Sequence, residues 1–208
     1  TGSGGDVFIM SQKHAVFSAS GSNRWINCPG SVELIKRVDF HEPSSPNAEE
    51  GTLAHAVLES VIKREQLPEG TNEDMIYHAN EAVNFIKSLG IPVLPENSEK
   101  RVTIDWLIPG QFGTCDYWYY DKASDTVYVI DYKYGFGVVE VEDNSQLTFY
   151  AMDDSIWNDF KNVVAVIIQP RAYHSEGRFR VWKSTRLEIM KIAAKMEQAY
   201  QRAQLKAA

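Results

Sequence analysis

The hydrophobic positions of this chain follow a helical period in its first half and an extended period later. Between residues 50 and 64, and again between residues 75 and 86, apolar side chains recur every three or four positions. This spacing places one apolar stripe along a helix, so two amphipathic helices are expected, the second ending at Gly90-Ile91-Pro92. Residues 41–51, HEPSSPNAEEG, are expected to form a loop by composition.

Before that loop, a short helix is expected through Trp25, because Ser20 or Ser22 can cap its first turn. The stretch SVELIKRV, residues 31–38, continues helically after the break at Pro29-Gly30.

From residue 100 the pattern becomes extended. Residues 100–108, 111–121 and 125–134 are rich in β-branched and aromatic side chains, and turn residues separate them. Three antiparallel strands are therefore expected. The remaining elements are expected to be a helix over 144–157, strands over 163–170 and 178–183, and a final amphipathic helix over 185–208.

This order of elements predicts an α/β protein with a central mixed sheet flanked by helices. The 208 residues, 44% of them hydrophobic and 12% aromatic, suffice for one domain with a real core. The first nine residues, which begin TGSGG, look like an expression scar, so residues 10–208 are taken as the single domain.

Several protein classes are disfavoured by what the sequence lacks. The longest clean apolar run, residues 163–168, is far shorter than a membrane span, and no segment has the pattern of a signal peptide. We therefore expect no membrane partner and a cytoplasmic protein. Two cysteines, Cys28 and Cys115, are too few for a disulfide framework, a four-cysteine zinc site or an unaided iron–sulfur cluster, so they are expected to be reduced thiols.

Positive charge is concentrated at the C-terminal end of an acidic chain. The net charge is −7, but residues 171–208 carry nine Lys or Arg against three acids, and therefore +6. A localised phosphate-binding face would produce this asymmetry, and a solvated helix face explains it equally well. The candidate phosphate contacts are Arg171, Arg178, Arg180 and Lys183.

A pair of opposite charges follows the buried run of the third expected strand, in VIDYKYGFG. Asp131 and Lys133 are two positions apart and therefore project from the same face of a strand. Asp116 lies in the preceding strand, which pairs with this one through the turn at 122–125, so the two carboxylates are expected to meet at one end of the sheet. Taken alone, the Asp-x-Lys pair also fits an ordinary surface ion pair.

The helix over residues 50–64 offers an imidazole and a carboxylate to the same place. His55 and Glu59 are spaced i, i+4 and share one helix face, although Glu59 could equally pair with Lys63. Such a convergence of acids, imidazole and ammonium is costly without a cation. Mg²⁺ prefers carboxylate oxygens and water, and Mn²⁺ also accepts imidazole. With a lysine beside the metal, the pattern indicates hydrolytic phosphodiester chemistry.

These motifs together resemble a known nuclease family. The strings GTLAH with Glu59, FGTCD, IDYK and NSQLTFY resemble, in this order, the motif series of the RecB-type branch of the PD-(D/E)XK nuclease superfamily. The similarity is greatest to phage- and prophage-encoded members and spans residues 17–150. SASGSNRWINCPGS also resembles the Ser…Cys-Pro signature that opens many RecB-like nucleases.

The resemblance implies a fold, a cofactor and a set of roles. It implies a PD-(D/E)XK nuclease-like core and a Mg²⁺ or Mn²⁺ site. We expect no iron–sulfur cluster, because the three further cysteines that bind one in some relatives have no counterpart here. Glu99 matches a strand acid of the relatives or is an exposed strand charge. The implied metal ligands are His55, Asp116, Asp131 and the carbonyl of Tyr132, and the implied catalytic residues are Lys133, Asp116, Asp131 and Glu59, with Gln146 and Tyr150 lining the site.

The expected function is therefore a divalent-metal-dependent DNA exonuclease in phage recombination or DNA processing. Its expected partners are DNA with free ends, which the tyrosines and tryptophan at 117–120 or Tyr132 and Tyr134 could stack against, and a phage recombination partner such as a single-strand annealing protein. Homo-oligomerisation is left open. The alternative is a non-catalytic nucleic-acid-binding or protein-interaction module on a nuclease fold.

Overall fold

A five-stranded mixed sheet organises the chain. The computed structural model describes residues 15–38 and 45–207, so the expected scar at residues 1–9 lies outside the described part. The strands follow one another in the order β1-β2-β3-β4-β5, and only the β3–β4 pair is parallel. They are β1 (Ser98–Thr103), β2 (Phe112–Asp121), β3 (Thr126–Tyr132), β4 (Asn162–Ile168) and β5 (Phe179–Thr185).

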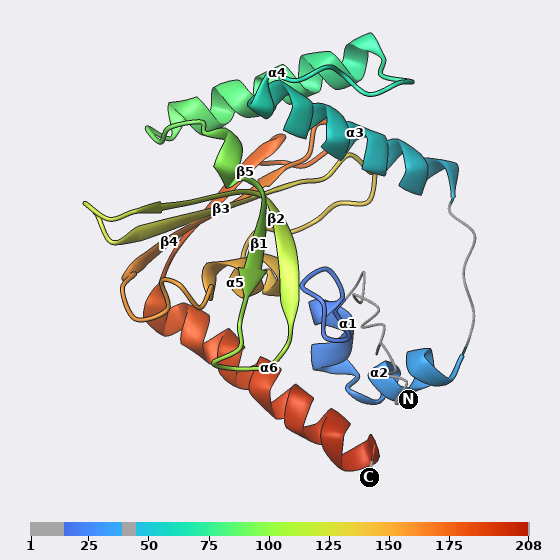
Figure 1. Ribbon diagram of the computed structural model, residues 1–208, viewed down its shortest axis with the longest axis vertical. Coiled ribbons are helices and arrows are strands. Elements are labelled where there is room, and N and C mark those ends of the chain that lie inside the picture. Colours follow the sequence, from blue (N-terminus) through green and yellow to red (C-terminus); the bar gives the residue numbers. More distant parts are fainter. Residues whose placement is uncertain (1–14, 39–44, 208) are drawn as a thin grey trace, which may run out of the picture.

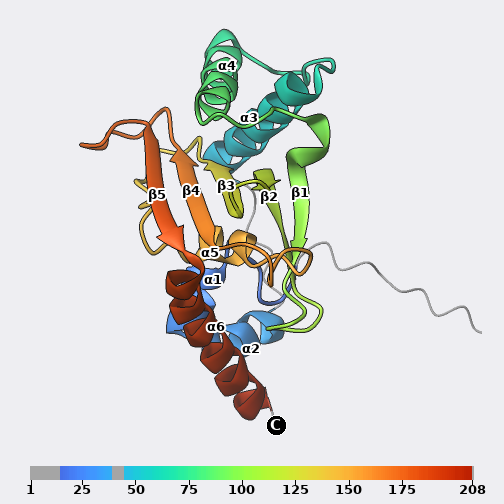
Figure 2. The ribbon, with the colours of Figure 1, turned by 90° about the vertical axis from the view of Figure 1, so that its left-hand side faces the viewer.

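Helices cover both faces of this sheet (Figures 1 and 2). One face carries α3 (Pro46–Lys63) and α4 (Glu73–Ser88), and the other carries α1 (Ser22–Asn27), α2 (Gly30–Arg37), α5 (Ser145–Ala151) and α6 (Arg186–Ala207). A short 3-10 turn, η1 (Pro95–Asn97), precedes β1. The expected α/β fold with a mixed sheet flanked by helices is confirmed.

Alternation along the strands builds a separate hydrophobic core on each face. In β3, Val127 and Val129 belong to the core under α5 and α6, whereas Ile130 and Tyr132 belong to the core under α3 and α4. Successive side chains of a strand point to opposite faces, so a strand covered on both faces reads as a nearly continuous apolar run.

Within the described residues, no helix combines the length and apolarity needed to cross a bilayer.

Local capping explains where α3 begins, and it corrects one expected boundary. The side chain of Ser45 accepts a hydrogen bond from the backbone N–H of Ala48, and Pro46 occupies the first helical turn. Proline is favoured there because its missing N–H would have no helical partner. Helix α3 thus starts inside the stretch expected to be a loop, of which residues 41–44 lie outside the described residues.

Two other boundaries differ from the sequence expectation because of side-chain contacts across the fold. Helix α5 ends at Ala151 rather than at residue 157, since the Asp153 carboxylate accepts hydrogen bonds from the N–H groups of Thr103 and Ser155. The first expected strand stops at Thr103, and the Asp154 carboxylate caps the following turn. The sheet also extends past the three expected antiparallel strands through the parallel β3–β4 pair.

The strands β2 and β3 separate at one end of the sheet. Their pairing runs only as far as Tyr117 and Ile130; beyond this point β2 pairs with β1, and the last residues of β3 pair with β4. The Asp116 carboxylate takes the place of the next backbone acceptor, because its Oδ2 accepts the N–H of Tyr132 at 2.6 Å. The separation opens the sheet where the polar residues of both strands lie.

Candidate metal centre and catalytic site

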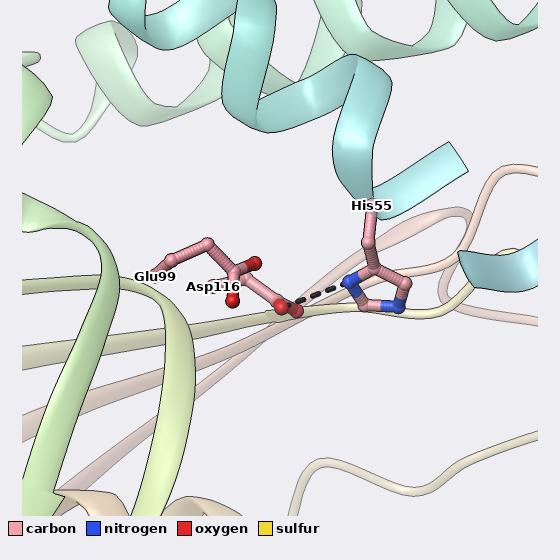
Figure 3. A group of neighbouring side chains, drawn as sticks. All are labelled: His55, Glu99 and Asp116. Atoms are coloured by element: carbon pink, nitrogen blue, oxygen red, sulfur yellow. Dashed lines mark hydrogen bonds and ion pairs between the residues drawn. The ribbon is translucent and has the colours of Figure 1, made fainter. Parts of the chain in front are cut away.

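Three ligand-type side chains converge where β2 leaves β3 (Figure 3). They are His55 of α3, Glu99 of β1 and Asp116 of β2, and one ligand atom from each lies within 4.8 Å of the others. The Nδ1 atom of His55 is 2.9 Å from Oδ1 of Asp116. One imidazole and two carboxylates form a donor set suited to Mn²⁺, and to Mg²⁺ that keeps several waters. This cluster could hold a divalent metal ion.

The backbone brings Glu99 to the cluster at some cost. Ser98 pairs with Tyr117 and Lys100 with Cys115, so Glu99 lies beside Asp116 on the neighbouring strand. Its φ of 50° falls in the left-handed region, which is uncommon for residues other than glycine. Strained backbone of this kind is concentrated at functional sites.

Burial and the charges of neighbouring carboxylates together set the electrostatics of the cluster. Burial and the charge of Asp116 raise the pKa of Glu99 to about 7. Burial alone would lower the pKa of His55, but the carboxylates of Asp116, Asp131 and Glu99 outweigh it and raise the pKa to about 9. The cluster therefore retains protons near neutral pH, and a divalent cation would neutralise the same carboxylates.

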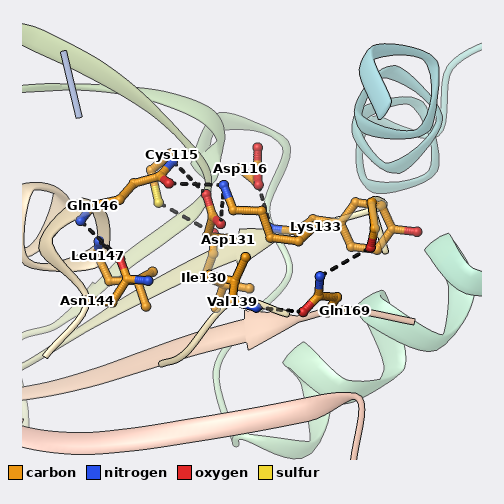
Figure 4. A network of polar contacts seen from close by, with 12 residues as sticks. Cys115, Asp116, Ile130, Asp131, Lys133, Val139, Asn144, Gln146, Leu147 and Gln169 are labelled. Carbon is orange, nitrogen blue, oxygen red and sulfur yellow. Dashed lines mark hydrogen bonds and ion pairs between the residues drawn. The ribbon is translucent and has the colours of Figure 1, made fainter. Parts of the chain in front are cut away.

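A second polar group adjoins the cluster and consists of a partly buried network around Lys133 (Figure 4). The Nζ atom of Lys133 lies 2.8 Å from Oδ2 of Asp131 and donates a hydrogen bond of 3.0 Å to Oε1 of Gln146. The amide nitrogen of Gln146 donates to Oδ1 of Asp131 at 2.9 Å and to the hydroxyl of Tyr150 at 3.0 Å. Asp131 is only 3% exposed.

Burial and pairing act together on the charges of this network. Burial raises the pKa of Asp131, and the charge of Lys133 opposes that rise. Burial tends to lower the pKa of Lys133, but the charge of Asp131 outweighs it and the pKa is raised. Lys133 therefore remains an ammonium, held in place by a carboxylate and an amide.

Both groups face one open cavity of about 380 Å³. It lies between the α3 side of the sheet and the start of α5, at the separation of β2 and β3. A substrate entering this cavity would meet both the ammonium and the group of His55, Glu99 and Asp116, which is a candidate site for a metal ion and is called the metal-binding cluster below. Side chains from both groups line it, namely His55, Asp116, Asp131, Lys133, Gln146 and Tyr150.

Three residues expected to act at the metal or in catalysis have other contacts. Glu59 forms an ion pair with Lys63 one turn along α3, and the metal-binding cluster contains Glu99 instead. Asp131 pairs with Lys133 and stands beside the cluster rather than in it. Tyr132 contributes its backbone N–H to Asp116.

The basic residues expected to bind phosphate do not form one free surface. Arg180 is 1% exposed, and its guanidinium donates to the carbonyls of Gly177 and Val139 and to Gln169 Oε1, so its expected contact with DNA is wrong. Arg178 forms an ion pair with Glu81. The two remaining candidates differ: Arg171 pairs with Glu50 at 2.6 Å and lies over the rings of Tyr134 and Phe136, while Lys183 is exposed on β5.

The aromatic residues expected to stack against DNA are mostly core residues. Tyr117 is buried and donates its hydroxyl to the carbonyl of Pro92, and Trp118 is buried and donates its indole N–H to the carbonyl of Tyr150. Tyr132 and Tyr134 are also buried. These side chains have no surface on which a base could stack.

The residues of the N-terminal signature are divided between packing and the surface. Trp25 is fully buried and donates its indole N–H to the carbonyl of Ser18, which fits a structural role. Cys28 is exposed, and Cys115 is buried with its thiol donating to the carbonyls of Tyr117 and Ile130.

Close packing of the N-terminal segment against β2 completes the wall of this cavity. A Cβ added at Gly113 would lie 2.7 Å from Cβ of Ala19 and 2.9 Å from Cε1 of Tyr150. Only glycine admits that approach. Ser20, which belongs to the N-terminal signature, also lines the cavity, although the sequence gave it no place in the expected site.

Comparisons with known proteins place the chain in a family. A solved structure titled "Crystal structure of SSO0001" is similar over 84% of this chain and 84% of its own, with 13% sequence identity and a TM-score of 0.29. Similarity at that level is too low to assign an activity. A family model described as "Protein of unknown function (DUF2800)" matches residues 14–205, and the chain belongs to this family.

Proposed function

We propose that this protein is a Mg²⁺- or Mn²⁺-dependent DNA exonuclease that hydrolyses phosphodiester bonds. The observation that carries the proposal is one cavity of about 380 Å³ lined both by members of the metal-binding cluster and by the half-buried Lys133. The ordered motifs that resemble RecB-type nucleases, including Asp116, Asp131 and Lys133, support the same chemistry. The proposed setting is the processing of DNA ends.

The polar side chains at the cavity would divide the roles of such a hydrolysis. Bound Mg²⁺ or Mn²⁺ would supply Lewis acidity and lower the pKa of a water molecule. His55, Glu99 and Asp116 would hold the ion at the separation of β2 and β3. As water attacks, its oxygen bonds to phosphorus, the bond to the leaving oxygen breaks and a proton passes to that oxygen.

The ammonium of Lys133 offsets the negative charge that grows on the phosphate oxygens during this step. Asp131 and Gln146 hold its Nζ atom at 2.8 Å and 3.0 Å, and Tyr150 fixes Gln146 from the other side. A charge held in place before the reaction needs no reorganisation during it. Lys133 is thus the proposed catalytic residue, and Gln146 and Tyr150 are positioning residues.

Attack at an end fits the distribution of positive charge. Reading a duplex from its groove requires side chains aimed at base edges and many phosphate contacts. Among the residues that the structure describes, Arg180 is buried and Arg171 and Arg178 are paired with acids. A DNA end that enters the cavity needs fewer phosphate contacts than a duplex that is read from its groove.

The test compares linear DNA with covalently closed circular duplex, each with Mg²⁺, with Mn²⁺ and with EDTA. Linear DNA should be shortened progressively from its ends, and EDTA should abolish cleavage. Lys133→Ala should reduce turnover on the order of 100-fold or more, the scale for losing one electrostatic partner of a transition state. Lys161→Ala is the matched control, because Lys161 also pairs with an aspartate, Asp125 at 2.6 Å, but on the surface.

Three outcomes would contradict the proposal. Full activity of Lys133→Ala would reduce the Asp131–Lys133 pair to an ordinary ion pair. Nicking of the circle as fast as the linear DNA is degraded would exclude an exonuclease. DNA binding without cleavage under any metal condition would favour a non-catalytic nucleic-acid-binding module.

A further inference from the structure

A second, larger cavity adjoins the catalytic one on the other side of Lys133. Its volume is about 620 Å³, within the range of roughly 300–1,000 Å³ that is typical of small-molecule sites. Ser20, Lys133 and Gln146 line both cavities, so the two meet at the proposed catalytic lysine. The second cavity extends from there between α1, α6 and the loop that leads into α5.

The walls of the second cavity carry neutral polar and aliphatic groups. Amide side chains come from Asn23 and Asn27 of α1, which are hydrogen bonded to each other, and from Asn144, whose side chain also caps α5. Aliphatic surface comes from Val138 in the loop and Ile192 of α6. Apolar surface combined with neutral donors and acceptors suits a ligand with flat apolar faces and polar edges.

The charges at the second cavity are mostly negative. Three exposed acids of the loop line it: Glu140, Glu142 and Asp143. Apart from Lys133, which is paired with Asp131, the lining contains one basic residue, Lys195 of α6. A doubly charged phosphate would therefore be disfavoured there, whereas a neutral group would not.

The loop that forms one wall is held in a fixed position. The side-chain amide of Gln169, fully buried at the end of β4, donates to the carbonyls of Gly135 and Gly137, and its oxygen accepts the N–H of Val139 (Figure 4). Arg180 donates to the carbonyl of Val139 and to the same oxygen of Gln169. This explains why Arg180 is buried, and it leaves the second cavity formed before any ligand binds.

We propose that the second cavity binds the terminal nucleoside of the strand being cut, while the scissile phosphate lies at Lys133. The proposal rests on the proposed nuclease function and adds to it a substrate preference. A nucleoside has flat apolar base faces and hydrogen-bonding edges, which match the aliphatic and amide walls. The acids at the cavity disfavour a terminal phosphate, so strand ends with a hydroxyl are preferred and each cut releases one nucleotide.

The first test fills the second cavity without touching the metal-binding cluster. Val138 is 49% exposed, so Val138→Trp can place its ring in the cavity without disrupting a core. Val181→Trp is the matched control, because Val181 is 39% exposed on β5 and lines neither of the two cavities. Val138→Trp should lower kcat/KM on linear single-stranded DNA at least about tenfold, and Val181→Trp should not.

Two further readouts separate a blocked subsite from a damaged protein. Mn²⁺ binding measured by calorimetry should be the same in Val138→Trp, Val181→Trp and the unaltered protein. Binding of a short single strand with hydroxyl ends, measured by fluorescence anisotropy in EDTA, should weaken only in Val138→Trp.

The second test changes the charge of the second cavity. The unaltered protein should cleave a strand with hydroxyls at both ends about threefold to tenfold faster than the same strand with phosphates at both ends. This ratio is the size expected for repulsion between a terminal phosphate and the exposed acids of the second cavity. Glu142→Gln combined with Asp143→Asn should bring this ratio close to one. Asparagine suits position 143, whose φ is 52°, because it tolerates the left-handed region.

The outcomes distinguish this inference from the function on which it rests. If the unaltered protein cleaves DNA but Val138→Trp behaves like Val181→Trp, only the terminal-nucleoside subsite is wrong. A first product of two or more nucleotides, or equal rates on hydroxyl and phosphate ends, would overturn it in the same way. If no DNA is cleaved with Mg²⁺ or Mn²⁺, the nuclease function fails and the subsite fails with it.

Discussion

Replacing Glu99 with glutamine tests which acid completes the metal-binding cluster. Glu99 is within 4.8 Å of His55 and Asp116, whereas Glu59 is paired with Lys63. Loss of residues that merely orient metal ligands costs about 10- to 100-fold in affinity, so loss of a ligand should cost at least on the order of 100-fold. Glu59→Gln, the matched control, should change the Mn²⁺ affinity less than about threefold.

The same substitution should stabilise the metal-free protein above neutral pH. Burial and Asp116 raise the pKa of Glu99 from 4.5 to about 7. At about 1.4 kcal/mol for each unit, this rise would correspond to about 3 kcal/mol in a fully dehydrated site, and partial solvent contact reduces it to about 1–2 kcal/mol. The folded state is thus penalised for ionising this carboxyl.

The sign and the pH window of this effect follow from linkage. The folded state binds the proton of Glu99 more tightly than the unfolded state, so stability falls as pH rises. There is no penalty below about pH 4.5, it grows between pH 4.5 and about 7, and it is constant above that. Glu99→Gln should lack this component of the pH dependence.

Two measurements check the prediction. Mn²⁺ is titrated by calorimetry into the unaltered protein, Glu99→Gln and Glu59→Gln. Urea unfolding in EDTA is then followed at about pH 5 and about pH 8, and the advantage of Glu99→Gln should appear only at the higher pH. Unchanged Mn²⁺ affinity in Glu99→Gln, equal loss in Glu59→Gln, or lower stability of Glu99→Gln at the higher pH would refute the assignment.

Two further predictions concern packing and thiol exposure. Gly113→Ala should destabilise the protein by about 1–3 kcal/mol, because the added methyl group overlaps two neighbours. Gly51→Ala, inside α3, should stabilise it by up to about 1 kcal/mol, because a Cβ added there meets no neighbouring atom within 4 Å. Urea unfolding measures both effects, and equal effects would contradict the close approach at Gly113. In the folded protein a thiol reagent should modify the exposed Cys28 and spare Cys115, whose burial raises the pKa of its thiol, until denaturant is added. Rapid modification of Cys115 under native conditions would contradict its place in the core.

Local patterns in the sequence were sufficient for the class of fold and for part of the site. Hydrophobic period distinguishes a helix from a strand without knowledge of the rest of the chain, because it depends on residues a few positions apart. The Asp-x-Lys spacing likewise predicted that Asp131, in β3, and Lys133, just after it, project to the same side, and the structure has them in contact. The convergence of His55 and Asp116 followed from the order of the motifs, and their side chains are hydrogen bonded.

Tertiary structure decided the questions that depend on distant parts of the chain. The spacing of His55 and Glu59 allows both to face the sheet, but the placement of α3 over β1 puts Glu99 in the metal-binding cluster. The charge count treated Arg180 as a surface residue. In the structure its guanidinium is buried, because it donates hydrogen bonds to the side-chain oxygen of Gln169 and to the carbonyl of Val139. The second cavity joins α1, α6 and the loop before α5, which meet only after folding. Sequence patterns record short-range periodicity, while burial and convergence arise from long-range packing that one sequence read locally does not contain.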